Sequence, residues 1–115
     1  MLKAGIALVD ISPDKGVQMA GYPHCPRPNI GIHDPLYCGA LHLDNGHDSI
    51  TLVTFDLLYF GKSYCREIRE KLGGNITFTT SHTHSGPWSS TPLASDASAY
   101  ITGAGINVDG GYTAR

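Results

Sequence analysis

Two histidines one residue apart, His82 and His84, are the side chains of this sequence best suited to chemistry. They lie in TSHTHSGPWSS, residues 80–90, directly after the alternating run NITFTT and before a Gly-Pro break. In an extended segment, residues two apart point to the same side, so both imidazoles can face one cavity while Thr83 faces away. Neutral imidazole is a good zinc ligand, and a catalytic zinc typically takes three protein ligands plus water. From spacing alone, a metal site and two ordinary strand-end histidines are equally good interpretations.

The segments before the histidines predict the element order that positions them. Residues 62–72, KSYCREIREKL, repeat apolar side chains every four positions and end at two glycines, which predicts a helix. Strands are expected at about 49–56 and 75–80. Strand, helix and strand form a βαβ unit, whose two strands are parallel with a right-handed crossover. His82 and His84 then follow the carboxyl end of the second strand, where ligands gather in α/β sheets.

The rest of the chain completes an α/β fold with a small mixed sheet. Residues 4–11 are rich in Ile, Leu and Val, which predicts a strand. A long loop rich in proline and glycine follows between residues 13 and 35. Two further apolar runs, 36–46 and 47–60, are separated by an Asp-Asn-Gly turn signal and are expected to form a hairpin.

Composition and charge exclude several classes of partner. The chain has 115 residues, which suits one compact unit. Its formal net charge of −2 argues against binding to nucleic acid. No apolar run reaches the length of a membrane span, and the short apolar core near the amino terminus is not a convincing signal peptide, which favours a cytoplasmic location. The three cysteines, Cys25, Cys38 and Cys65, are odd in number and widely spaced, so we expect reduced thiols.

An ordered series of segments carries a resemblance to a known family. Together they resemble the amino-terminal part of the neutral/alkaline (non-lysosomal) ceramidase family over about residues 3–87. The segments are KAGIALVDISP, MAGY, GIHDPLYCGALHLDNG, ITLVTFDLL, REIREKLG and TSHTHSGP. The resemblance implies an α/β fold and a zinc-dependent site that hydrolyses the amide bond of ceramide.

The same resemblance assigns roles to the two histidines. His82 corresponds to the family's zinc-ligand histidine, and His84 to a catalytic-site histidine beside a ceramide-like lipid amide. Asp56, His33 and Asp34 lie in family-like segments without a defined role. As structural alternatives, Asp56 can cap the turn after its strand, and His33-Asp34 can order the loop.

The resemblance also implies an incomplete site. In that family a further histidine, a glutamate and a tyrosine complete the zinc ligands, and these residues and the catalytic serine lie well downstream. Only residues 85–115 follow His84 here, and they do not resemble that region. One or two histidines do not hold a catalytic zinc tightly. We therefore expect a fragment of a zinc amidohydrolase with partial zinc binding and little activity alone.

The end of the chain resembles a different family. Residues 93–115, LASDASAYITGAGINVDGGYTAR, are similar to the carboxyl-terminal end of short-chain dehydrogenases/reductases. The sequence predicts a chimera, with a ceramidase-like region at 1–88, a junction at 89–92 and this tail. Nucleotide binding is not expected, because no Gly-rich fingerprint follows the first strand and Tyr100 lacks the lysine of a Tyr-x-x-x-Lys motif. The alternatives are a dehydrogenase-derived domain and a non-catalytic domain, with oligomers possible through exposed strand edges.

Overall fold

A computed structural model describes residues 1–22, 24–25 and 27–89 of the chain. The dehydrogenase-like tail at 93–115 and most of the predicted junction lie outside these residues. Within these residues, four strands and one helix are formed, and their positions agree with the predicted α/β element order. They are β1 (Lys3–Asp10), β2 (Tyr37–Asp44), β3 (Ser49–Phe55), α1 (Lys62–Leu72) and β4 (Ile76–Thr80).

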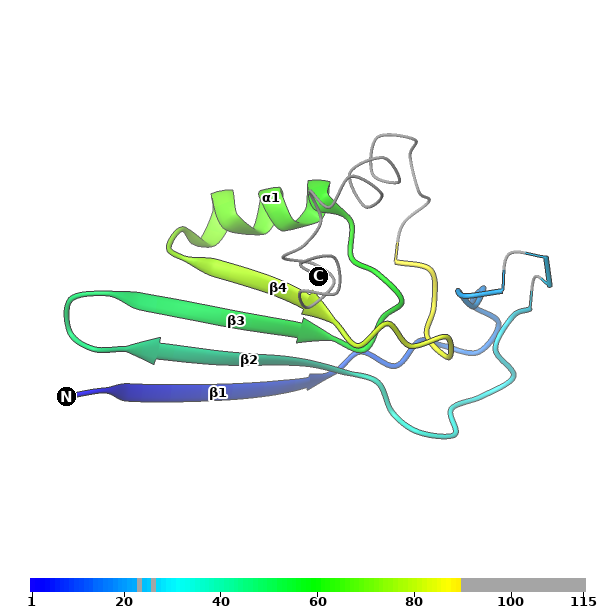
Figure 1. Ribbon diagram of the computed structural model, residues 1–115. Coiled ribbons are helices and arrows are strands. Elements are labelled where there is room, and N and C mark those ends of the chain that lie inside the picture. Colours follow the sequence, from blue (N-terminus) through cyan, green and yellow to red (C-terminus); the bar gives the residue numbers. More distant parts are fainter. Residues whose placement is uncertain (23, 26, 90–115) are drawn as a thin grey trace, which may run out of the picture.

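The four strands form one mixed sheet in the order β1-β2-β3-β4 (Figure 1). β2 pairs antiparallel with β1 on one side and with β3 on the other. β3 and β4 are parallel, with α1 between them in the chain, which confirms the predicted βαβ unit. The hairpin is also confirmed, and its turn places Gly46 at a φ of 91°, in the left-handed region that glycine tolerates. The sequence predicted the first strand but not its partner.

The hydrophobic core lies between α1 and the β3–β4 half of the sheet. Cys65 of α1 and Phe78 of β4 are each only 1% exposed, and Ile76 is buried beside them. Phe55 and Phe60 pack on this cluster, with Phe60 contributed by the connection from β3 to α1. The alternation of Ile76 and Phe78 with threonines therefore reflects one strand face turned toward the helix.

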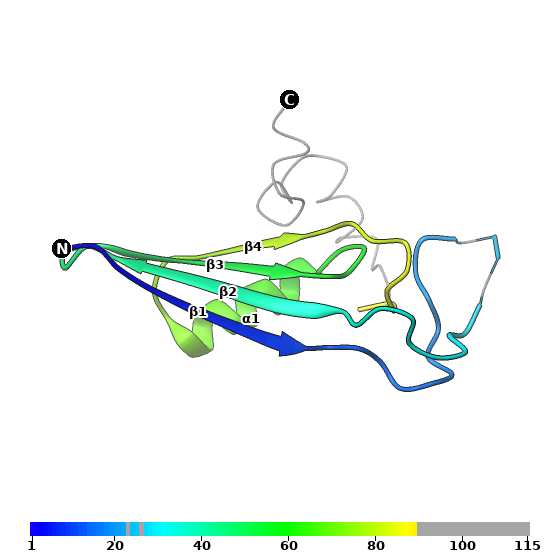
Figure 2. The ribbon, with the colours of Figure 1, turned by 90° about the horizontal axis from the view of Figure 1, so that it is seen from below.

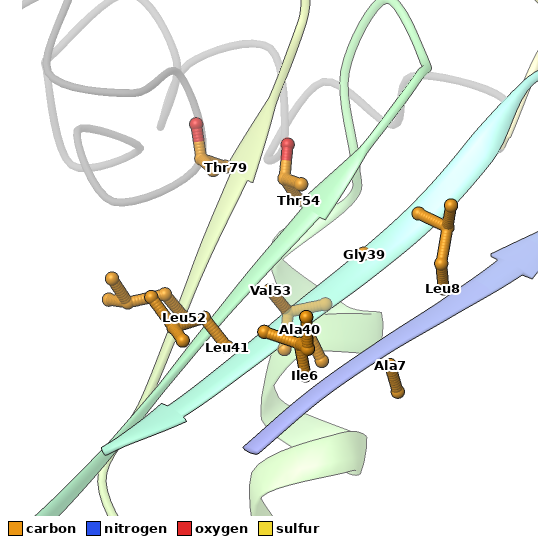
Figure 3. A pocket seen from close by; sticks show the side chains of 10 residues that line it. All are labelled: Ile6, Ala7, Leu8, Gly39, Ala40, Leu41, Leu52, Val53, Thr54 and Thr79. Atoms are coloured by element: carbon orange, nitrogen blue, oxygen red, sulfur yellow. The ribbon is translucent and has the colours of Figure 1, made fainter. Parts of the chain in front are cut away.

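The opposite face of the sheet is apolar, and the described residues leave it largely uncovered. Ile6 is 84% exposed and Leu8 67% exposed, and they adjoin an open hollow above β2 and β3 (Figure 3). Figure 1 shows α1 beside β4 with β1 along the far edge of the sheet, and Figure 2 shows β4 and β1 as the two outer strands. Within the described part of the chain, no helix has the length and apolar character needed to span a membrane.

The long loop between β1 and β2 is held by backbone pairing with the segment that follows β4. Met19 and Pro87 form an antiparallel bridge, and the amide of Ala20 donates to the carbonyl of Gly86 at 2.9 Å. At the base of the loop the amide of Ile11 donates to the carbonyl of Leu36. The loop was predicted, but its alignment beside the histidine segment was not (Figure 1).

The cysteines occupy three different environments. All three are free thiols: Cys25 is exposed, Cys38 is half-buried and Cys65 is in the core. Burial raises the pKa of the Cys38 thiol, which favours its protonated form. This agrees with the prediction of reduced cysteines, although Cys25 is not buried.

Candidate functional site

His82 lies two residues beyond the end of β4 and has an unusual backbone conformation. Its φ of 57° is in the left-handed region, and it is the one non-glycine residue with positive φ among residues 1–22, 24–25 and 27–89. The prediction of an extended path through His82 is therefore wrong. The left-handed residue redirects the chain at the sheet edge, because the following segment pairs with the N-terminal loop rather than continuing the strand.

The His82 side chain is fixed by the connection between β3 and α1. Its Nδ1 lies 2.8 Å from the carbonyl oxygen of Leu58. A carbonyl oxygen can only accept a hydrogen bond, so Nδ1 carries the proton in the neutral ring. The lone pair is then on Nε2, which is the arrangement usually found in histidines that bind a metal.

His84 has the same arrangement with a different backbone partner. Its Nδ1 lies 3.2 Å from the carbonyl oxygen of Gly21, in the N-terminal loop. The two imidazole rings are 5.3 Å apart between centroids and nearly perpendicular, at 79°. The two rings are therefore neighbours, although the backbone between them is not extended as expected.

The pair offers part of a zinc site. Two neutral imidazoles, each with its Nδ1 held by a carbonyl, provide nitrogen ligands of the type that zinc prefers. Within the described part of the chain, no group of three histidine, cysteine or acidic side chains is arranged to hold a metal. The residues present therefore fit one or two ligand positions of a zinc centre.

Asp56 supports the sheet rather than the histidine pair. Its carboxylate accepts a hydrogen bond from the amide of Tyr37 at 3.0 Å, and its own amide donates to the carbonyl of Tyr37. These bonds extend the β2–β3 pairing by one residue. Asp56 is thus a strand-end carboxylate, as its structural alternative proposed, but it bonds to the neighbouring strand instead of capping the next turn.

His33 and Asp34 are exposed residues of the long loop. Their side chains are 100% and 88% exposed, and the nearest His33 nitrogen is 3.9 Å from the Asp34 carboxylate. An exposed pair of this kind contributes little to stability. Among the described residues, no hydrogen bond or ion pair joins them to His82 or His84.

The Ser-Gly-Pro segment after the histidines forms a tight, packed turn. The amide of Ser85 donates to the Thr83 hydroxyl at 3.1 Å, and Gly86 is buried. A Cβ placed on Gly86 would lie 3.2 Å from the Asp56 carbonyl oxygen. This close packing requires a small residue and holds the histidine segment against the end of β3.

Sequence reasoning missed three residues around His84. The Tyr22 ring meets the His84 ring edge-on at a centroid distance of 5.6 Å. Arg27 stacks on the Tyr22 ring at 4.6 Å and donates to the backbone carbonyl of His84 at 3.2 Å. Gly21 and Tyr22 belong to the MAGY segment, whose match to the family was the one available signal, but it defined no contact with His84.

Comparisons with known proteins identify a fold relative. No family model matches the chain, and no curated protein matches it significantly. Among solved structures, neutral ceramidase from Pseudomonas aeruginosa matches with a TM-score of 0.64 and 23% identity, over 76% of this chain and 16% of that one. A ceramidase complexed with C2 matches with the same TM-score and identity, over 76% of this chain and 15% of that one.

These matches confirm the ceramidase-like relation at the level of fold. The chain spans about one-sixth of the length of the two solved ceramidases, so it corresponds to a limited part of each. The matched share of this chain agrees with the three-quarters over which the sequence segments resemble that family.

Proposed function

We propose that this chain is a ceramidase-like fragment carrying the first histidine segment of a zinc-dependent amidohydrolase for lipid amides such as ceramide. In this proposal His82 is a zinc ligand through Nε2, and His84 is the catalytic-site histidine that faces the substrate. The chain alone provides an incomplete site and has little hydrolytic activity.

One observation carries the proposal: two adjacent imidazoles have their Nδ1 atoms on backbone carbonyls. The carbonyls of Leu58 and Gly21 orient the rings of His82 and His84 and select the tautomer with a lone pair on Nε2. Ordinary exposed histidines at a strand end need no such partners. The pair also follows the carboxyl end of a parallel strand, β4, the edge at which α/β sheets bind ligands.

His82 and His84 have different chemical roles in this proposal. When bound, zinc acidifies a water molecule toward neutral pH and so supplies hydroxide for attack on an amide carbonyl. His82 would bind the metal, and the hydrogen bond from its Nδ1 to the Leu58 carbonyl would fix the orientation of the ring. His84, with an available Nε2, can accept a proton or a hydrogen bond from a group beside the metal.

The fold comparison supports the choice of reaction. Two solved proteins with a similar fold over this region are ceramidases, and ceramide is a lipid amide. The short share of their length covered here is consistent with a site completed by other residues. No observation among the described residues favours the dehydrogenase alternative, because the resembling tail lies outside them.

Zinc titration against a chromophoric chelator tests the metal assignment. We expect weak zinc binding by the wild-type chain and a loss of more than about tenfold in His82→Ala, because even removing a partner behind a ligand costs 10- to 100-fold. His47→Ala, which changes an exposed histidine in the β2–β3 turn, should bind zinc like the wild type.

The same preparations should be assayed for hydrolysis of a fluorescent N-acylsphingosine. Little turnover is expected, with or without added zinc. Equal zinc affinity in wild type and His82→Ala would contradict the ligand assignment. Tight stoichiometric zinc with efficient amide hydrolysis by the isolated chain would contradict the incomplete site.

A further inference from the structure

The N-terminal loop lies so close to His84 at Gly21 that only glycine, which has no Cβ, fits there. Gly21 has a φ of 97°, and a Cβ built on it would lie 2.7 Å from Nδ1 and 2.8 Å from Cγ of His84. Real Cβ atoms do not approach other atoms so closely. Two independent requirements, the left-handed backbone and the contact with the imidazole, therefore coincide at Gly21.

The same close approach gives His84 its hydrogen-bond partner. The carbonyl of Gly21 lies 3.2 Å from Nδ1, which makes that nitrogen the donor and leaves the lone pair on Nε2. A larger residue at position 21 would move either the loop or the ring. Either movement breaks the contact that selects the tautomer of His84.

The next residues of the loop hold the ring and its backbone from a second side. Tyr22 contacts the His84 ring edge-on, and the guanidinium of Arg27 lies over the Tyr22 ring. Arg27 also donates to the carbonyl of His84, so one side chain links the tyrosine to the histidine backbone. These contacts restrict rotation of the imidazole about its side-chain bonds.

Backbone hydrogen bonds hold the N-terminal loop and the histidine segment next to each other. The amide of Ala20, directly before Gly21, donates to the carbonyl of Gly86, and the amide of Trp88 donates to the carbonyl of Gln18 at 3.2 Å. These two hydrogen bonds join the loop residues before Gly21 to the residues that follow His84. The position of Gly21 relative to His84 is set by this ladder rather than by one hydrogen bond.

We propose that Gly21 and Tyr22 are positioning residues that hold His84 in the Nδ1–H tautomer with Nε2 presented outward. The positioning is a property of the fold, and only its value for catalysis rests on the proposed function. His82 is held by a different segment, through Leu58, so loss of this contact should change His84 and leave the His82 tautomer as it was.

Ring-nitrogen NMR of the metal-free chain tests the proposal directly. Long-range proton–nitrogen spectra at a pH where imidazole is neutral show which nitrogen carries the proton. In the wild type we expect His84 to be mainly Nδ1–H. In Gly21→Ala the ratio of the two tautomers should shift by about fivefold toward that of exposed His47, the change produced by losing one neutral hydrogen bond of ordinary strength.

Gly16→Ala is the matched control. Gly16 lies in the same loop with a similar φ of 93°, but a Cβ there would meet nothing within 4 Å. It therefore imposes the same backbone strain without touching His84. An unchanged His84 tautomer in Gly21→Ala, or an equal shift in both variants, would overturn the assignment of Gly21.

A second pair of variants keeps the test valid if Gly21→Ala does not fold. Tyr22→Leu removes the aromatic contact and should also shift the His84 tautomer ratio, whereas Tyr22→Phe keeps the ring and should not. No difference between the two would overturn the role of Tyr22. Failure of zinc binding or hydrolysis, by contrast, bears on the proposed function and leaves the tautomer result intact.

Discussion

At the residue scale, His82 joins an unfavourable backbone conformation to a side chain held in one tautomer. A non-glycine residue in the left-handed region costs about 1 to 2 kcal/mol, and His82 adopts it with a φ of 57°. Such strain persists only where the surroundings impose it, and it concentrates at functional sites. The hydrogen bond from its ring to the Leu58 carbonyl is one such constraint.

Because of this strain, we expect glycine to be more stable than alanine at position 82, the reverse of the usual order. His82→Gly should be about 1 kcal/mol more stable than His82→Ala, because glycine tolerates positive φ. Thr83, which does not have a positive φ, provides the control, and Thr83→Ala should be more stable than Thr83→Gly. Urea unfolding of the four variants measures both differences. The same order at both positions would contradict a strained His82.

The pairing of the two histidines could be predicted from the sequence, but their environment could not. Spacing and position after a predicted strand indicated that His82 and His84 face the same side, but through an extended backbone that His82 does not adopt. The carbonyls of Leu58 and Gly21 that hold the rings are backbone atoms, for which the sequence carries no local signal. In the sequence, nothing distinguishes Gly21 from the other glycines of the loop, because its role depends on its distance from His84 in the fold.

At the element scale, periodicity predicted the βαβ unit because one face of each element is buried. Cys65 on α1 and Phe78 on β4 face the same core, and two glycines end the helix, with Gly73 at a φ of 67°. The pairing of β1 with β2 was beyond prediction, since a loop of 26 residues separates them and no local pattern fixes such a partner.

One side chain ties the last turn of α1 to β4. The Arg69 Nε donates to the carbonyl of Ile76 at 3.0 Å, and its guanidinium lies 5.0 Å from the centre of the Phe78 ring. β4 is an edge strand, so this carbonyl faces away from the sheet pairing. Arg69 therefore fastens the strand that leads into the histidine segment.

Removal of this contact should destabilise the fold measurably. We expect Arg69→Met to lower the free energy of unfolding by about 1 to 2 kcal/mol, through loss of a charged hydrogen bond and the contact with Phe78. Chemical denaturation gives the value. Arg66→Met, at an exposed position of the same helix, is the control and should change stability by less than about 0.5 kcal/mol. Equal losses of unfolding free energy in the two variants would contradict a stabilising role of the Arg69 contacts.

At the scale of the whole molecule, the chain has the fold of a limited part of a larger enzyme. Among the described residues, α1 covers one face of the sheet, and apolar side chains such as Ile6 and Leu8 are exposed on the other. β1 also presents an unpaired edge in the described structure. Association through this edge stays a prediction, as do the chimeric junction and the cytoplasmic location.

We propose that His82 binds zinc through Nε2 while its Nδ1 stays on the Leu58 carbonyl. Ring-nitrogen NMR during addition of zinc to the full chain tests this claim directly. We expect a selective shift of the His82 Nε2 signal with the Nδ1 proton retained, and no change at exposed His47. Loss of the Nδ1 proton on zinc binding, or a zinc response that leaves the His82 nitrogens unchanged, would contradict it.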